Sequence, residues 1–142
     1  FFASPFLNPL PTDCRFLILD LDGDAKSFAE PFTLSSPGTT IGGIIQGAIR
    51  NPSGINTLAG PITLAGNASI ISTGTGTSDS LLVTGNINTG TSTNTLTIDV
   101  TKGVRLSNVI SGTGGFTKNG SDTLLLYNTG ANTYSGITTI NG

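Results

Sequence analysis

The stretch that decides the fold is the last quarter of the chain, ISGTGGFTKNGSDTLLLYNTGANTYSGITTING, from Ile110 to Gly142. Short runs that alternate apolar residues with Thr or Ser are interrupted at close intervals by Gly or Asn-Gly. Each run is long enough for one short strand and too short for a stable helix. Such a unit cannot bury an apolar face alone and becomes stable when similar units stack on it. The stretch therefore predicts a parallel β-solenoid, in an all-β fold.

Related units occur upstream of this stretch. ITLAGN (62–67) and LLVTGN (81–86) share the pattern apolar-Thr-apolar-x-Gly-Asn or a close variant, and they start 19 residues apart (81 − 62). Solenoid coils commonly hold roughly 20–25 residues, so about four or five coils fit after residue 39. An antiparallel β-sandwich or jelly roll is the alternative, because it has a similar density of short strands and turns. Strands are predicted at 39–45, 55–58, 62–64, 69–72, 80–84, 95–100, 104–110, 123–127 and 137–140.

The chain divides near residue 38 into two parts. Residues 1–38 hold most of the prolines and phenylalanines, whereas 39–142 form the Gly-, Thr-, Asn- and Ser-rich repeat region. The segment FFASPFLNPLP (1–11) predicts an extended apolar arm, since proline lacks the donor that a central strand needs. Asp22-Gly23 is a strong turn signal, and it predicts a β-hairpin with strands in 15–21 and 25–34. We expect this hairpin to cap the solenoid.

The last quarter also resembles a known family, the autotransporter-associated β-strand repeat, also called the passenger-associated transport repeat. The matching positions are Ile110, Gly112, Gly114, Gly115, Phe116, Thr117-Lys118, Gly120, Thr123-Leu124, Leu126, Asn132-Thr133-Tyr134, Gly136, Thr138 and Ile140. Asp122 stands where the family usually has Gly, and the chain stops where the family would continue into another strand. The resemblance covers about a quarter of the chain and implies a segment of a bacterial autotransporter passenger domain, a region associated with secretion.

Composition excludes several classes of protein. The net charge is −2 and charged residues make up 10% of the chain, which argues against a nucleic-acid binder, because such a protein needs a basic face. The apolar residues alternate, and the longest apolar run (41–49) is far too short for a membrane span. Histidine is absent and Cys14 is the only cysteine, so nucleophilic Ser-His or Cys-His sites and ordinary zinc sites are excluded. We expect no enzyme and no cofactor.

One acidic segment is a weak candidate for calcium. Asp20, Asp22 and Asp24 stand at alternate positions, like the first three ligands of a calcium-binding loop. Ala25 and Pro31 occupy the later positions where such a loop needs Gly and Glu. A solvated acidic turn is therefore the favoured interpretation of this segment.

A second charged segment, DVTKGVR, contains Asp99, Lys102 and Arg105. In a β-helix groove these side chains could act on polysaccharide, with Asp79 or Asp122 as a second carboxylate. Charges that solvate a turn between coils are the favoured interpretation. In the repeat motif, we expect Tyr134 to pack and the Asn132 amide to serve a turn or a stack.

These observations predict a non-enzymatic, structural or adhesive β-solenoid that is secreted or lies at the surface of a bacterium. One alternative is a self-assembling extracellular filament subunit whose N-terminal arm covers the open end, near Gly142, of the next subunit. Another is a β-helix that binds or cleaves surface polysaccharide. The expected partners are therefore further copies of the chain, stacked end to end, or a surface polysaccharide, with no nucleic acid and no membrane span.

Overall fold

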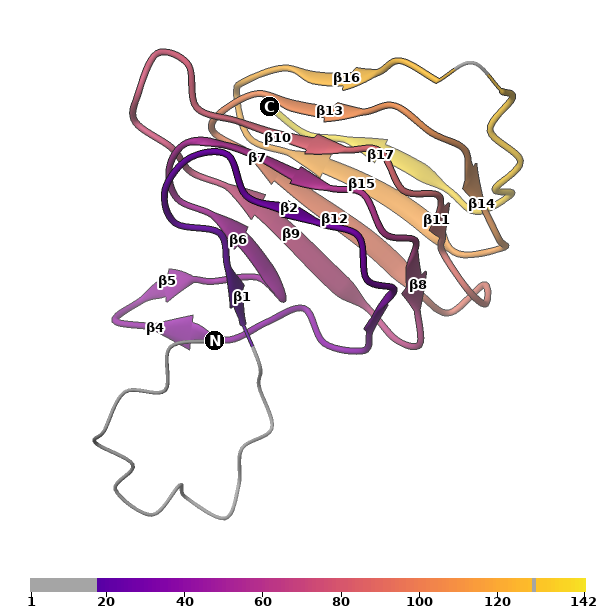
Figure 1. Ribbon diagram of the computed structural model, residues 1–142. Helices are drawn as coiled ribbons and strands as arrows, with labels where there is room; N and C mark the ends of the chain where they lie inside the picture. The colour runs from indigo at the N-terminus through magenta and orange to yellow at the C-terminus, as the bar shows by residue number, and fades with distance from the viewer. Residues whose placement is uncertain (1–17, 129) are drawn as a thin grey trace.

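The computed structural model describes residues 18–128 and 130–142, and this part of the chain contains strands and no helix. The chain winds into a parallel β-solenoid with three sheets, and each coil adds one strand to each sheet or leaves that position as a turn (Figure 1). Within the three sheets every strand pair is parallel. The predicted solenoid is confirmed, and the antiparallel sandwich is wrong.

The three sheets run side by side along the solenoid. Sheet A contains β1 (Leu19–Asp20), β6 (Ile49–Asn51), β9 (Ala68–Ser72), β12 (Thr95–Val100), β15 (Gly115–Asn119) and β17 (Thr138–Ile140). Sheet B contains β2 (Ser27–Phe28), β7 (Ile55–Leu58), β10 (Ser80–Val83), β13 (Val104–Leu106) and β16 (Leu124–Leu126). Sheet C contains β3 (Phe32–Leu34), β8 (Ile62–Leu64), β11 (Ile87–Asn88) and β14 (Ile110–Ser111).

The repeat has a different register from the one that the sequence suggests. ITLAGN begins with β8 of sheet C, whereas LLVTGN belongs to β10 of sheet B. The residue that pairs with Ile62 is Ile87, which in turn pairs with Ile110. The recurrence of 19 residues is therefore wrong as a coil length, although it led to the correct class of fold. Two different corners of one coil share the same pattern because both need an inward apolar residue followed by a tight bend.

Alternation of side chains along each strand builds the core. On β12, Leu96, Ile98 and Val100 point inward and are fully buried, while the residues between them face outward. Parallel pairing in register places Ile98 directly beside Ile70, which pairs with Ile49. The core is thus a set of continuous apolar rows. The largest fully buried side chains are Leu21, Ile49, Leu58, Ile62, Ile70, Leu81, Val83, Ile87, Leu96, Ile98, Leu106 and Ile110.

The corner between sheets B and C requires glycine in the second and third coils. A Cβ atom on Gly85 would fall on the carbonyl oxygen of Gly60 in the preceding coil, and a Cβ atom on Gly60 would fall on that of Glu30. Successive corners therefore stack backbone on backbone, which leaves no space for a side chain. This explains why Gly ends the apolar runs of successive coils.

The expected hairpin at Asp22-Gly23 is wrong. The strands on either side of it do not pair with each other: β1 pairs with β6 and β2 pairs with β7, both in parallel. The two residues instead turn the chain from sheet A to sheet B, so the first coil already begins at Leu19 and not after residue 38. A turn of this kind satisfies the same local preference for glycine at positive φ as a hairpin does.

An antiparallel ladder occurs elsewhere, in the segment between the first and second coils. β4 (Thr40–Ile41) and β5 (Ile44–Ile45) pair around Gly42 and Gly43, both with positive φ, so the single strand predicted at 39–45 is a short hairpin. The surrounding segment, 35–48, lies against the outer face of sheet A. The Ser69 hydroxyl donates a hydrogen bond of 2.5 Å to the Pro37 carbonyl, and Ser69 is buried. The predicted arm (1–11) and Cys14 lie outside the described residues.

Candidate functional site

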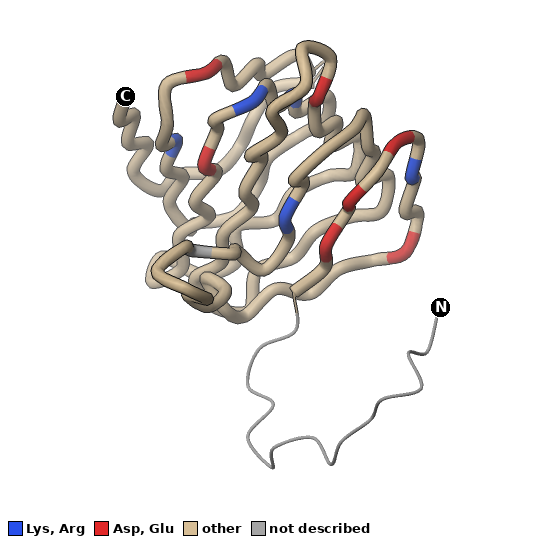
Figure 2. The backbone as a smooth tube through the Cα atoms, turned by 90° about the vertical axis from the view of Figure 1, so that its left-hand side faces the viewer, with Lys and Arg blue, Asp and Glu red and all other residues tan. Residues whose placement is uncertain are grey.

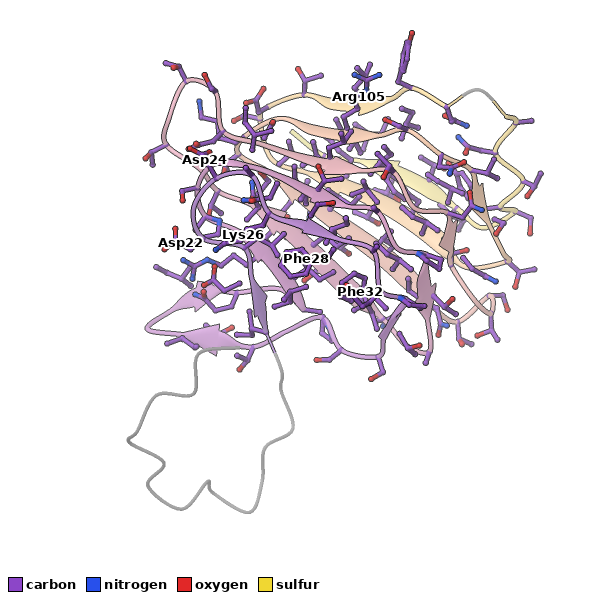
Figure 3. The ribbon with its side chains drawn as sticks, in the orientation of Figure 1. Asp22, Asp24, Lys26, Phe28, Phe32 and Arg105 are labelled. Atoms are coloured by element: carbon purple, nitrogen blue, oxygen red, sulfur yellow. The ribbon has the colours of Figure 1, made fainter. Side chains whose placement is uncertain are left out.

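The structure separates the three carboxylates of the calcium candidate. Asp22 and Asp24 lie at the first corner, at the edge of the solenoid (Figure 3). Each carboxylate meets a different group of the next coil: Asp20 lies 3.9 Å from Arg50 Nε, Asp22 accepts from Ser53 Oγ at 2.7 Å, and Asp24 accepts from the Ile55 N–H at 3.0 Å. Within 18–128 and 130–142, no three His, Cys, Asp or Glu side chains are grouped so that they could hold a metal ion. These carboxylates join the first two coils.

The charged segment DVTKGVR is also divided between faces. Asp99 lies on sheet A, where its neighbours are Ile71 and Asn119. Arg105 lies on sheet B, and its guanidinium stacks 4.4 Å from the centre of the exposed Tyr127 ring. Asp99 and Arg105 therefore do not share a groove. Figure 2 shows that charged residues are distributed over several coils rather than gathered in one place.

The two remaining candidate carboxylates bind backbone. Asp79 accepts hydrogen bonds from the N–H groups of Gly54 at 2.8 Å and Gly76 at 2.6 Å. These bonds, together with the nearby charge of Lys102, hold the pKa of Asp79 below its ordinary value of 3.8. Asp122 accepts from the N–H of Thr123 at 2.6 Å. A carboxylate with a lowered pKa is a poor general acid, so Asp79 is better suited to hold its loop than to donate a proton.

The repeat motif has the packing role expected for it. Tyr134 packs against the core, with its ring centre 6.2 Å from that of Phe116, and its hydroxyl is 2.7 Å from Thr138 Oγ1. The Asn132 side-chain oxygen accepts a hydrogen bond of 2.9 Å from the N–H of Ile110. The amide thus takes the place of a strand carbonyl at the edge of sheet C, where the fifth coil has no strand.

A groove lies on the outer face of sheet A, over β12, β15 and β17. We call it the hydroxyl groove, and its volume is about 510 Å³. Within residues 18–128 and 130–142, its lining contains six hydroxyl side chains, two glycines and one apolar residue, and no charged group. The residues are Ser92, Thr95, Thr113, Gly115, Thr117, Ser135, Gly136, Ile137 and Thr139. This groove was not predicted from the sequence, although the outward Thr residues of TLT at 95–97 are a visible signal.

Register explains how these hydroxyls come together. Thr117 pairs with Thr97 on one side and with Thr139 on the other, so the outward side chains form a row along the solenoid. Ser69 begins the same row, because it pairs with Thr97. The segment 35–48 covers the row at Ser69 and leaves it open from Thr97 onward. The outer face of sheet A therefore has a covered half and an open half.

The fold places the chain in a class, that of three-sheet parallel β-solenoids. Compared with known proteins, the chain matches no family model, no curated protein and no solved structure. The described residues include no helix that could span a membrane.

Proposed function

We propose that this chain is a non-enzymatic structural and adhesive segment of an exported bacterial surface protein, similar to part of an autotransporter passenger. Support comes from one observation above all: three parallel sheets enclose a continuous core, and the faces outside it carry mostly uncharged polar side chains. The middle coils of such a stack bury their apolar side chains against one another. Extension by one coil lengthens the rod without changing its cross-section.

Display on a cell surface tests this proposal. The chain would be placed between a signal peptide and an outer-membrane translocator in a Gram-negative host, and intact cells would then be treated with protease. The expected result is a surface-exposed, protease-resistant fragment. An Ile98→Asp variant, with a charge in the buried row, should be displayed without resistance, whereas the exposed Thr63→Val variant should match the parent. Failure of the folded parent chain to reach the surface would contradict the proposal.

A filament subunit is a second candidate, favoured by the last coil. Among the described residues, β16 and β17 are the final strands of sheets B and A, and Leu126, Ile137 and Ile140 are 43%, 81% and 73% exposed. Unpaired edges beside exposed apolar side chains favour addition of a further strand. The proposed role of the arm (1–11), which is to cover the open end of the next subunit, stays a prediction because the arm lies outside the described residues.

Sedimentation velocity at increasing concentration checks the filament alternative. Association that rises with concentration and is lost in an Ile140→Lys variant supports end-to-end contact. Ile55→Lys is a matched control, because Ile55 is 51% exposed on the outer face of sheet B. A chain that stays monomeric throughout removes the filament alternative and leaves the surface role intact.

The expected lack of catalysis also stays a prediction. It would be overturned by glycan hydrolysis that the purified chain carries out and that the Asp99→Asn variant does not.

A further inference from the structure

We infer that the hydroxyl groove binds a neutral polysaccharide, with the sugar chain lying along the solenoid axis across β12, β15 and β17. This assigns a ligand class to the adhesive part of the proposed function, and it rests on that proposal.

The chemistry of the lining selects the ligand. A hydroxyl can both donate and accept a hydrogen bond, as the hydroxyls of a sugar do, although the Thr113 hydroxyl already donates to the Gly90 carbonyl at 3.2 Å. The hydroxyls of Thr95, Thr117 and Thr139 have no hydrogen-bond partner among the described residues, so they are available. Among the described residues, no charged side chain lines the groove to offset the desolvation of a charged ligand, which disfavours an anionic glycan. Ile137, 81% exposed at the rim, offers an apolar contact for the C–H face of a sugar ring.

The shape of the groove suits a chain rather than a single small molecule. Gly115 stands between Thr95 and the last coil and has no side chain, which hollows the floor. Gly136 cannot carry a side chain, because a Cβ atom there would fall on the Gly114 carbonyl. Successive strands repeat the row of hydroxyls at a step of about 4.8 Å. A repeating polymer can meet such a row with equivalent groups at each step.

The covered half of the same face shows how such a chain can be held. There the segment 35–48 lies on sheet A, and the Ser69 hydroxyl donates to the Pro37 carbonyl. Thr97, Thr117 and Thr139 continue the row of Ser69 in register. One outward hydroxyl of this row, that of Ser69, therefore already binds a carbonyl oxygen of a covering segment. In the open half we assign the same role toward the oxygens of a neutral glycan, since six hydroxyl side chains line the groove there.

The test is a titration of the isotope-labelled intact chain, followed by amide chemical shifts. The probes are the neutral cello-, xylo-, manno- and maltohexaose, with anionic hexagalacturonate and an uncharged Pro-rich peptide as comparison arms. At least one neutral hexasaccharide should shift amides within 92–95, 113–117 and 135–139. A Thr117→Val/Thr139→Val variant should weaken binding about tenfold, because it removes two hydrogen-bonding groups and keeps side-chain volume. Thr63→Val, outward on sheet C, should change nothing.

Four other outcomes of this titration would overturn the inference. Absence of shifts with every neutral hexasaccharide, shifts located elsewhere, tighter binding of hexagalacturonate or of the peptide, or equal binding by the double valine variant would all do so. The unbound spectra of the parent and variants report folding separately. A folded, surface-displayed chain that binds no neutral hexasaccharide therefore overturns this inference and leaves the proposed surface role standing.

Discussion

The middle coils and the last coil have the same side-chain pattern and opposite exposure. Ile98 and Ile140 belong to one inward row of sheet A, with Lys118 paired between them. Ile98 is fully buried, whereas Ile140 is 73% exposed, because Ile98 has a coil on both sides and Ile140 has a coil on one. The difference teaches that a coil of this protein does not possess a core of its own. Burial is a property of the stack.

The largest expected effect comes from one substitution made in both regions. Ile98→Ala should lower the free energy of unfolding by about 2–5 kcal/mol, because it leaves a cavity between packed coils. Ile140→Ala should change it by less than about 0.5 kcal/mol, since this side chain already contacts water. Urea denaturation of both variants measures the two losses. Equal losses of unfolding free energy would contradict the difference between the middle coils and the end of the solenoid.

A smaller loss in the free energy of unfolding is expected from a substitution where two coils contact each other through their backbones. Gly85→Ala should cost about 3 kcal/mol, because the new Cβ atom must displace the corner of the preceding coil at Gly60. Gly103→Ala is the matched control, since a Cβ atom there meets nothing within 4 Å. Thermal or urea unfolding distinguishes them. If Gly85→Ala were as stable as Gly103→Ala, the corners would not stack as described.

The corner between sheets A and B depends on a buried amide. Asn56 is fully buried, and its Nδ2 lies 2.6–3.0 Å from the oxygens of Leu21, Gly23, Asn51 and Ser53. Asn56→Ala should cost about 1–3 kcal/mol, because these buried acceptors lose their donor. Asn86→Ala, at an exposed corner, should be close to neutral. Similar stability of the two variants would show that the amide does not join the first two coils.

The smallest expected effect is a pH dependence at Asp79. Its folded-state pKa lies below 3.8, because the N–H groups of Gly54 and Gly76 bond to the carboxylate. The stabilisation is complete above pH 3.8 and is lost as the pH falls through the lower folded-state pKa. Asp79→Asn should therefore be less stable than the parent near neutral pH, and the two should converge in acid. Urea midpoints across this pH range measure the difference in stability between the parent and the variant. A difference that grows in acid would contradict the lowered pKa of Asp79.

Periodicity and glycine placement were sufficient to predict the class of fold. The strand limits 55–58, 62–64 and 95–100 are also correct, because Gly, Pro or Asn stands close to each run. Register was not predictable in the same way, because ITLAGN and LLVTGN satisfy the same local rule at two different corners. The Asp22-Gly23 corner was mistaken for a hairpin for the same reason: a local turn preference does not reveal the partner strand.

The hydroxyl groove was harder to predict from the sequence than the fold. Charged residues were the candidates in the sequence, yet the structure places Asp24 and Asp79 in backbone hydrogen bonds. The hydroxyl groove depends on which Thr residues of successive coils lie side by side, and that depends on coil length. Coil lengths vary: Ile70 pairs with Ile98, and Ile98 pairs with Lys118, so the two steps are 28 and 20 residues (98 − 70 and 118 − 98). A sequence without the register cannot align these rows.

Native-state amide hydrogen exchange tests most directly the central claim that stability comes from stacking. Amides of β9 and β12, with coils on both sides, should exchange with a free energy close to that of global unfolding. Amides of β16 and β17, the last strands of sheets B and A, should exchange with a clearly lower free energy. A graded loss of protection from the middle of the solenoid to β17 is the predicted result. Equal protection in β12 and β17, or greater protection at β17, would contradict the account.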